Sequence, residues 1–359
     1  MRRSIASWLG VLSLAGSSSA LAQTTADPSA CDDHDTASLI QAIEAELVTL
    51  RASPSEPRIT MGKRTLSNQA YVDRILIPIQ KAARVGKSAL CKLLGRQLKL
   101  QPLHRRPGHV TAYYHPIISG SRTAHGSFQV PLYRRPSDEV LAHKTTQEIL
   151  DGALSGQDLA IVYVDSLATA LHVHIEGSAT IALDDGSEVN LTTDGHNGHP
   201  YQNPIRLLIK DKRIPVDFPA EQGKSKTQSF VAAHPEVLRE YWNRNPHFVF
   251  FKETPLRGTG KFGELIAGRS IAIDPKHVPM GALLLLKTHV AIHSDDPSIT
   301  SKPIARLVLA QDTGSAIVGP GRVDLFVGSG EDARVAASRT SYPGELFLLV
   351  PKRKPAQSR

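Results

Sequence analysis

The stretch "AQDTGSAIVGPGRVDLFVG", from Ala310 to Gly328, decides the fold. It carries two aspartates, Asp312 and Asp324, in a segment too rich in glycine to form one helix. Its two ends are short apolar runs of the kind that form buried strands. Runs of the same type recur over roughly 100 residues as "HFVFF", "SIAID", "ALLLLK", "ARLVLA", "VDLFVG" and "ELFLLV". So many short strands separated by turn residues predict a small β-barrel.

Helices are predicted mainly in the N-terminal part of the chain. Apolar residues at helical spacing predict a helix over residues 35–51, with Asp35 as its N-cap. A second helical stretch is expected over residues 69–98. A third is expected over residues 227–242, with a new helix starting at Pro235 because proline is tolerated in a first turn.

Residues 170–193 alternate between polar and apolar side chains, which predicts strands. In this prediction His172, His174 and Glu176 share one strand face. The dipeptide Asp185-Gly186 predicts a hairpin turn. The polar face needs a function, and a sugar-binding groove is one candidate.

The composition is that of a soluble globular protein with room for two domains, with 359 residues, 41% hydrophobic and 21% charged. Residues 1–22 predict a secretory signal, with Arg2 and Arg3 before an apolar run and a cleavage site before Gln23. No later stretch has the roughly 18 apolar residues of a membrane helix. Cys31 lacks the surroundings of a lipoprotein acylation site. We therefore expect an exported, periplasmic, soluble protein.

Export also bears on partners and on the cysteines. The net charge of +8 suits an anionic partner, and outside the inner membrane this is the cell wall and not nucleic acid. The two cysteines, Cys31 and Cys91, are predicted to form a disulfide, because an even pair in an exported chain is more often bonded than free. The basic tail over residues 353–359 is expected to be a frayed end.

Three aspartates punctuate predicted strands of the C-terminal region: Asp274 in "GRSIAIDPKHVPMG", Asp312 and Asp324. Upstream lie the blocks "VTAYYHPIISGSRT" with "FQVPLYRRP", then "DGHNGHPYQNPIRLLI" and "NRNPHFVFFKE". Across residues 105–351, and in this order, the motifs resemble the membrane-bound lytic murein transglycosylase A family. The resemblance implies a mainly β fold with an N-terminal helical segment, in which a double-psi β-barrel (three-aspartate) domain is interrupted by an inserted β-rich domain.

The resemblance implies a division of the chain into five parts. These are the signal peptide (1–22), the N-terminal helical segment leading into the barrel (23–104), the barrel (105–117 and 250–352), the inserted domain with the substrate groove (118–249) and the basic tail (353–359).

Cleavage of a glycosidic bond needs a proton delivered to the leaving oxygen, and ordinary hydrolases use two carboxylates. A lytic transglycosylase needs only one, because the C6 hydroxyl of the N-acetylmuramic acid ring is the nucleophile and closes a 1,6-anhydro ring. By resemblance that residue is Asp324. Asp312 and Asp274 are supporting carboxylates: Asp312 either tunes the acid or satisfies backbone N–H groups, and Asp274 is favoured in a structural turn.

Groove-lining residues also follow from the resemblance. The implied substrate-binding residues are Thr111, Tyr113, Tyr114, Glu176, Ser178, Asn197, His199 and Tyr201. A solvated strand face and half-buried tyrosines are the alternatives from the residues alone. The chain departs from the family pattern at Ala112, at His115, at Glu176 with Ala179, and at Ser315.

The implied function is lytic cleavage of peptidoglycan glycan strands in wall turnover, with no metal or other cofactor and no indicated protein partner. Two alternatives stay open. His172 and His174 on one strand face, with His196, His199 and Asp194, would suit a zinc-dependent wall peptidase. The departures from the pattern would permit a peptidoglycan-binding protein without catalysis.

Overall fold

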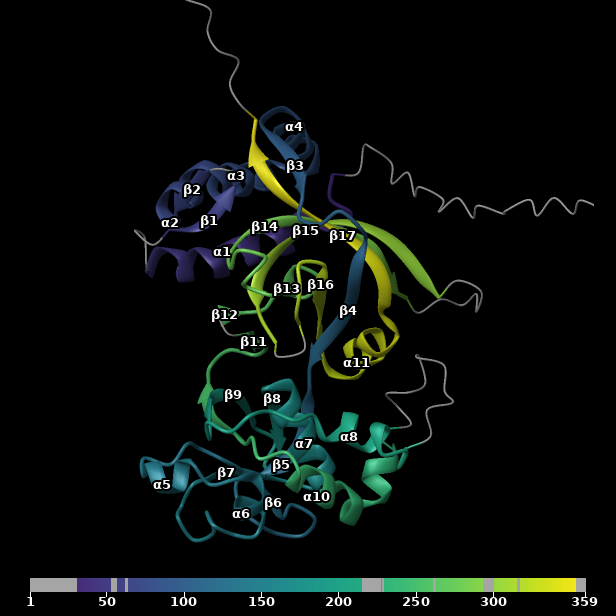
Figure 1. The fold of residues 1–359 in the computed structure, drawn as a ribbon. Helices are drawn as coiled ribbons and strands as arrows, with labels where there is room; N and C mark the ends of the chain where they lie inside the picture. Colours follow the sequence, from purple (N-terminus) through teal and green to yellow (C-terminus); the bar gives the residue numbers. More distant parts are fainter. Residues whose placement is uncertain are drawn as a thin grey trace, which may run out of the picture.

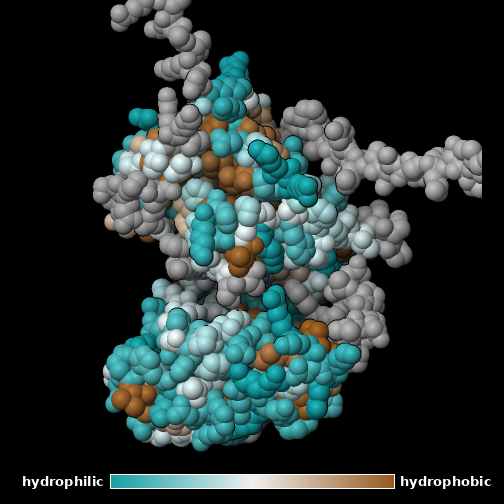
Figure 2. Space-filling model, viewed as in Figure 1, coloured by the Kyte–Doolittle hydropathy of each residue, from teal (hydrophilic) through white to brown (hydrophobic). Residues whose placement is uncertain are grey.

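Figure 1 shows the computed structural model, in which the chain forms two lobes joined by a narrow waist. The N-terminal helices and the barrel form one lobe, and the inserted β-rich part forms the other. The same waist is visible on the molecular surface (Figure 2). The structure describes residues 31–52, 57–61, 64–214, 227, 229–260, 263–292, 300–314 and 317–352. The predicted signal peptide, the basic tail and Ser315 lie outside the described residues.

A closed sheet of six strands forms the barrel. The strand order is β14-β15-β13-β16-β4-β17, and β17 pairs again with β14, which closes the ring. β3 extends the sheet beyond β17. The strands are β3 (Leu98–Pro102), β4 (Gly108–His115), β13 (Ser270–Ala272), β14 (Leu283–Ala291), β15 (Ser301–Asp312), β16 (Arg322–Ser329) and β17 (Ser341–Pro351). The predicted barrel is confirmed, and α11 (Gly330–Arg339) packs against β4 and β16.

A six-stranded open sheet forms the inserted lobe, in the order β10-β9-β8-β5-β7-β6. Its strands are β5 (Ile117–Ser121), β6 (Val130–Tyr133), β7 (Ala160–Val164), β8 (Ser178–Leu183), β9 (Glu188–His196) and β10 (Val249–Thr254). Its helices include α5 (Glu139–Ala142), α6 (Thr146–Leu150), α7 (Leu167–Glu176), α8 (Pro204–Lys210) and α10 (Pro235–Asn243). The domain boundary predicted at residue 250 falls inside β10, which pairs with β9 of this sheet. The short strands β11 (Thr259–Gly260) and β12 (Gly263–Glu264) lead back to the barrel.

Each lobe has its own hydrophobic core. The barrel core collects leucine, isoleucine and valine side chains of the closed sheet together with the inner face of the first helix. The core of the inserted lobe is more aromatic and is built around the fully buried Trp242, Phe250 and Phe251. Two separate cores are what a chain of two domains requires.

The N-terminal helices cover one side of the barrel (Figure 1). The first predicted helix is confirmed as α1 (Thr36–Ala52), and Asp35 accepts a hydrogen bond from the Ser38 backbone N–H at 2.7 Å. The second stretch is divided where Gly86 adopts φ 130°, a conformation that favours glycine. Its parts are α2 (Asn68–Tyr71), the π-helical turn η1 (Val72–Leu76), α3 (Ile77–Val85) and α4 (Lys87–Gln97), preceded by the hairpin of β1 (Pro57–Met61) and β2 (Arg64–Ser67).

One prediction of local structure is wrong. Residues 170–176 form the end of helix α7 and not a strand, so His172 and His174 do not share a face. Ser166 caps the helix by accepting from the Thr169 N–H, and Gly177 ends it at φ 74°. The apolar residues that we placed on alternate strand positions also fit helical spacing, and packing in the inserted core decides between the two periods. The predicted hairpin turn at 185–186 is confirmed between β8 and β9.

Residues 31–33, which include two aspartates, attach the segment before α1 to α4 and to the barrel. Cys31 and Cys91 form a disulfide bond to α4. The carboxylate of Asp32 accepts two hydrogen bonds of 2.8 Å from Arg269, and both side chains are fully buried. Asp33 pairs in the same way with Arg306, at 2.7 and 2.9 Å. These contacts hold residues 32 and 33 against β15 and the turn before β13.

The buried pair of Asp32 and Arg269 gives a stability prediction. The substitution Asp32→Ala leaves the Arg269 charge buried without its partner and should lower the free energy of unfolding by about 3–5 kcal/mol. Asp35→Ala removes an exposed helix cap and serves as the control, with an expected loss of about 1 kcal/mol. Urea unfolding of both variants measures the difference. Equal losses in the two variants would show that the buried pair is not a stabilising contact.

Candidate active site

Both candidate carboxylates lie in one row across the barrel sheet. Thr111 of β4 lies opposite Asp324 of β16, Asp324 lies opposite Ala272 of β13, and Ala272 lies opposite Asp312 of β15. Residues directly opposite each other share a sheet face. The backbones of Asp312 and Asp324 are therefore two strand spacings apart, roughly 10 Å, with a small alanine side chain between them.

Asp324 is held by a threonine from the neighbouring strand. The hydroxyl of Thr111 donates to Asp324 Oδ1 at 2.5 Å and accepts from Arg322 Nη2 at 2.9 Å. Because the guanidinium can only donate, it directs the threonine hydrogen toward the carboxylate. Sequence reasoning missed Arg322, although it stands two residues before Asp324 on one strand and so faces the same side.

Asp312 is held by a tyrosine from the same strand, β4. Tyr113 donates its hydroxyl to Asp312 Oδ2 at 3.0 Å, and its ring contacts Phe326 at 5.3 Å between centroids. Burial, followed by the nearby charges of Asp312, Asp324 and Glu176, holds the pKa of Tyr113 well above its usual value. The tyrosine therefore stays a hydrogen-bond donor to Asp312.

Asp274 joins two loops by hydrogen bonds to their backbone, one at Lys276 and one at Gly319. Its Oδ2 accepts from the Gly319 N–H at 2.8 Å and its Oδ1 from the Lys276 N–H at 3.0 Å. These backbone hydrogen bonds, the one from Gly319 first, lower the pKa of Asp274. The arrangement favours the structural role over a catalytic one.

On the inserted-lobe side, the end of α7 faces the barrel strand β4. Tyr114 lies 3.0 Å from His172 Nε2 through its hydroxyl oxygen, and His172 lies 3.6 Å from Glu176 Oε1. Burial, followed by the charge of Glu176, raises the pKa of Tyr114. Thr111 and Tyr113 thus contact the carboxylates directly, whereas Tyr114 points to the other face of β4, belongs to the barrel core and contacts His172.

The other predicted groove residues have different surroundings. Asn197 is buried. Its amide nitrogen donates to the Lys144 and Pro246 carbonyls, and its amide oxygen accepts from the Phe248 N–H. His199 contacts the His143 carbonyl at 2.9 Å, and Tyr201 is exposed beside His247. Ser178 is buried and contacts His115 at 3.1 Å. The structure therefore uses Asn197 to brace a turn of the inserted lobe.

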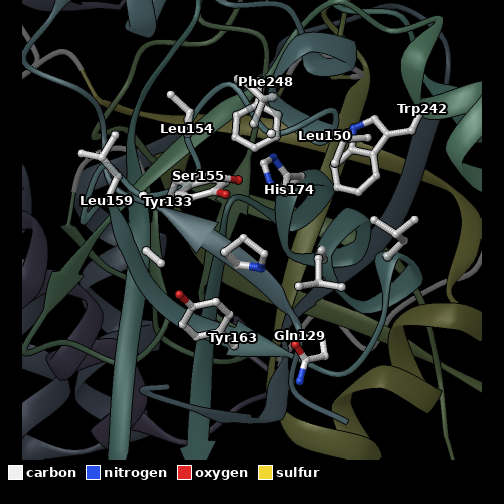
Figure 3. A pocket seen from close by; sticks show the side chains of 18 of the residues that line it. Gln129, Tyr133, Leu150, Leu154, Ser155, Leu159, Tyr163, His174, Trp242 and Phe248 are labelled. Carbon is white, nitrogen blue, oxygen red and sulfur yellow. The ribbon is translucent and has the colours of Figure 1, made fainter. Parts of the chain in front are cut away.

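A separate cavity of about 690 Å³ lies in the inserted lobe, and none of the substrate-binding residues implied by the resemblance lines it (Figure 3). The ring of His174 lies among its lining residues, near Trp242 and Phe248, at 5.2 and 4.4 Å between ring centroids. Burial, and to a lesser degree His247, lowers the pKa of His174 to about 3. With this pKa His174 is neutral at physiological pH, and its ring lines this cavity with Trp242 and Phe248.

Within the described ranges, no cluster of three His, Cys, Asp or Glu side chains is arranged to hold a metal ion. The proposed zinc ligands diverge, since His172 faces β4 while His174 packs among aromatic rings. No helix of the described part of the chain is long and apolar enough to cross a membrane.

Two family models match the sequence, the MltA specific insert domain over residues 109–252 and the 3D domain over residues 269–350. The chain is 27% identical over 253 residues to the membrane-bound lytic murein transglycosylase A of Vibrio cholerae, a match that covers 69% of this chain and 67% of that protein. It is also 27% identical to a homologue from Buchnera aphidicola, of which the match covers 65%. The chain thus matches about two thirds of the length of these curated relatives.

Solved structures show the same fold. A membrane-bound lytic murein transglycosylase from Agrobacterium tumefaciens is similar with a TM-score of 0.72 and 26% identity, covering 90% of this chain and 95% of that one. The E. coli MltA with bound chitohexaose is similar with a TM-score of 0.68 and 24% identity, covering 89% and 90%.

Fold and site together define the class as a lytic transglycosylase built on a double-psi β-barrel with an inserted domain. The chain belongs to the membrane-bound lytic murein transglycosylase A family.

Two buried histidines give a pH prediction. Burial, followed by the charge of Arg257, lowers the pKa of His115 to about 4 from 6.5, and that of His174 is about 3. Below pH 6.5 the unfolded chain binds protons that the folded chain does not, so stability falls on acidification. Between pH 6.5 and about 5, the free energy of unfolding should fall by up to about 1.4 kcal/mol per pH unit for each histidine.

The measurement is denaturant unfolding at several pH values for the native chain and for His174→Phe, which keeps an aromatic ring at this site. In the variant, the free energy of unfolding should depend less steeply on pH than in the native chain. An identical slope in both proteins would show that His174 is not the buried neutral group described here.

Proposed function

We propose that this protein cleaves the β-1,4 bond between N-acetylmuramic acid and N-acetylglucosamine in peptidoglycan and forms a 1,6-anhydro-N-acetylmuramic acid end. Asp324 is the single catalytic residue in this proposal. The observation that carries it is the position of Asp324, fixed by Thr111 and Arg322 in the row that also holds Asp312. Family membership supports the reaction class.

The proposed reaction needs one proton carrier. The carboxyl group of Asp324 gives its proton to the glycosidic oxygen, the C1–O bond breaks, and N-acetylglucosamine leaves with its hydroxyl restored. The C6 hydroxyl then bonds to C1, and the Asp324 carboxylate takes its proton. No water is consumed, and the carboxyl group is regenerated.

Asp312 serves this reaction by orientation. Its two oxygens accept from the Tyr113 hydroxyl and from the Thr313 N–H at 3.0 and 2.9 Å. These contacts favour a fixed carboxylate over one that activates water. Asp274 supports the loops in the same proposal.

The substrate would lie between the lobes. Bound chitohexaose in the E. coli relative supports a glycan site in this fold. In this chain the barrel side of the cleft would be formed by Thr111 and Tyr113 of β4, and the inserted side by Glu176 at the end of α7. A signal peptide over residues 1–22 and action in the periplasm, in wall turnover, belong to the same proposal.

The product of digestion tests the proposal. Incubation of the native protein with peptidoglycan sacculi should release muropeptides with 1,6-anhydro ends, lighter by one water than hydrolase products. Asp324→Asn keeps the shape but cannot carry the proton, so release should stop while binding to sacculi remains. Mass spectrometry of the products and sedimentation with sacculi measure the two effects. Products with added water would contradict the single-carboxylate mechanism, and binding without any product would favour the non-catalytic alternative.

Thr111 provides a finer prediction. Thr111→Val keeps the side-chain shape and removes the hydroxyl between Arg322 and Asp324. A lost hydrogen bond to a charged group is worth about 1.5–3 kcal/mol, so kcat should fall by about 10- to 100-fold. Thr111→Ser keeps the hydroxyl and should retain most of the activity. Equal rates for Thr111→Val and the native protein would show that the hydroxyl does not act through Asp324.

A further inference from the structure

The two lobes are joined by two chain crossings, residues 115–117 between β4 and β5 and residues 254–259 between β10 and β11. An ion pair between Arg257 and Glu188 spans the second crossing, but both side chains are nearly half exposed. Exposed pairs contribute little to stability. Among the described residues, buried polar contacts between the lobes are found at the first crossing.

His115, the last residue of β4, makes two such contacts with β8. Its ring is 2% exposed, with Nδ1 at 3.1 Å from Ser178 Oγ and Nε2 at 2.9 Å from Thr180 Oγ1. Thr180 donates its own hydrogen to Asn190 Oδ1 of β9 at 2.6 Å, so it accepts from the histidine. His115 therefore carries its hydrogen on Nε2, and Nδ1 accepts from Ser178. Every hydrogen bond in this chain of contacts has a defined direction.

Tyr114 points to the opposite face of β4 and contacts α7. Its side chain is 9% exposed, and its hydroxyl lies 3.0 Å from His172 Nε2. His172 is one helical turn before Glu176, the last residue of α7. Since β8 begins at Ser178, the two neighbouring residues of β4 contact the elements on both sides of the turn at Gly177.

This turn is coupled to the carboxylates of the barrel. Glu176 lies 3.6 Å from His172, His172 contacts Tyr114, and Tyr113, the neighbour of Tyr114 in β4, donates to Asp312. Thr193 of β9 also donates to the Gly177 carbonyl at 2.7 Å, which fixes the turn within the inserted lobe. A shift of the turn relative to β4 would therefore move Glu176 with respect to Tyr113.

We propose that Tyr114, His115, His172, Ser178 and Thr180, here called the junction cluster, are positioning residues that fix the inserted side of the glycan cleft relative to Asp324. The role as a cleft rests on the proposed function. The cluster fixes the position of the turn that carries Glu176 relative to β4, the strand that carries Thr111 and Tyr113. Burial and the charge of Arg257 keep His115 neutral at physiological pH, which preserves the direction of its two hydrogen bonds.

The test compares three variants of the full chain. His115→Phe keeps a ring but removes both hydrogen bonds. His115→Gln places an amide N–H near the position of Nε2 and can still donate to Thr180. Thr146→Val is the matched control, because it removes a buried hydroxyl that donates to the His247 carbonyl at 2.9 Å, within the inserted lobe and away from the junction.

Hydrogen exchange of the β8 amides, melting temperature, affinity for chitohexaose, and KM and kcat on sacculi are measured for each. His115→Phe should speed exchange at residues 178–180 by about tenfold and raise KM by about tenfold with a smaller change in kcat. In His115→Gln, the exchange rate at residues 178–180 and KM should both lie between those of the native protein and those of His115→Phe. Thr146→Val should lower the melting temperature without changing KM or exchange at these residues.

Two results would overturn the proposal. One is unchanged exchange and KM in His115→Phe; the other is an equal change of both in Thr146→Val, which would indicate general destabilisation. If the native protein releases no anhydro product, the proposed function fails. Exchange rates and the affinity for chitohexaose then still decide whether the junction cluster positions the inserted lobe.

Discussion

The register of β4 against β16 is the constraint on which the site depends. It places Thr111 opposite Asp324, and two residues later it places Tyr113 opposite Phe326. A slip of one residue would turn both side chains to the other face of the sheet and separate them from the carboxylates. The closed ring of strands prevents such a slip, because β4 is paired on its other edge with β17 as well. Barrel closure and active-site geometry are thus one structural requirement.

The same strand has a second role at its end. Its last residues, Tyr114 and His115, both contact the inserted lobe: Tyr114, which also belongs to the barrel core, contacts His172, and His115 contacts β8. One continuous strand therefore carries the contacts to Asp324, the contact to Asp312 and the contacts to the other lobe. If Asp324 is the catalytic group as proposed, this strand fixes the inserted side of the proposed cleft relative to it.

Sequence reasoning predicted the elements whose apolar runs are unambiguous. The strands of the barrel, α1 with its Asp35 cap and the 185–186 hairpin turn belong to this group. Sequence reasoning failed where one segment fits both the strand and the helix pattern. The segment "ALHVHIE" alternates as a strand does but also has helical spacing, and packing of His174 against aromatic rings favours the helix. It also could not separate Asn197, which braces backbone carbonyls, from groove residues, because both are polar residues in one glycine-containing block. Such distinctions depend on tertiary contacts between distant parts of the chain.

Asp312 and Asp324 share a sheet face but have different chemical surroundings. Asp312 accepts from a tyrosine whose raised pKa keeps it a donor, and from a backbone N–H. Asp324 accepts from a threonine that is itself oriented by a guanidinium. A hydrolase pair needs both carboxylates to face the scissile bond, with one of them free to activate a water or to attack the sugar itself. Ala272 lies on the strand between them and Tyr113 donates to Asp312, which supports the proposed mechanism with one proton carrier and the substrate's own hydroxyl as nucleophile.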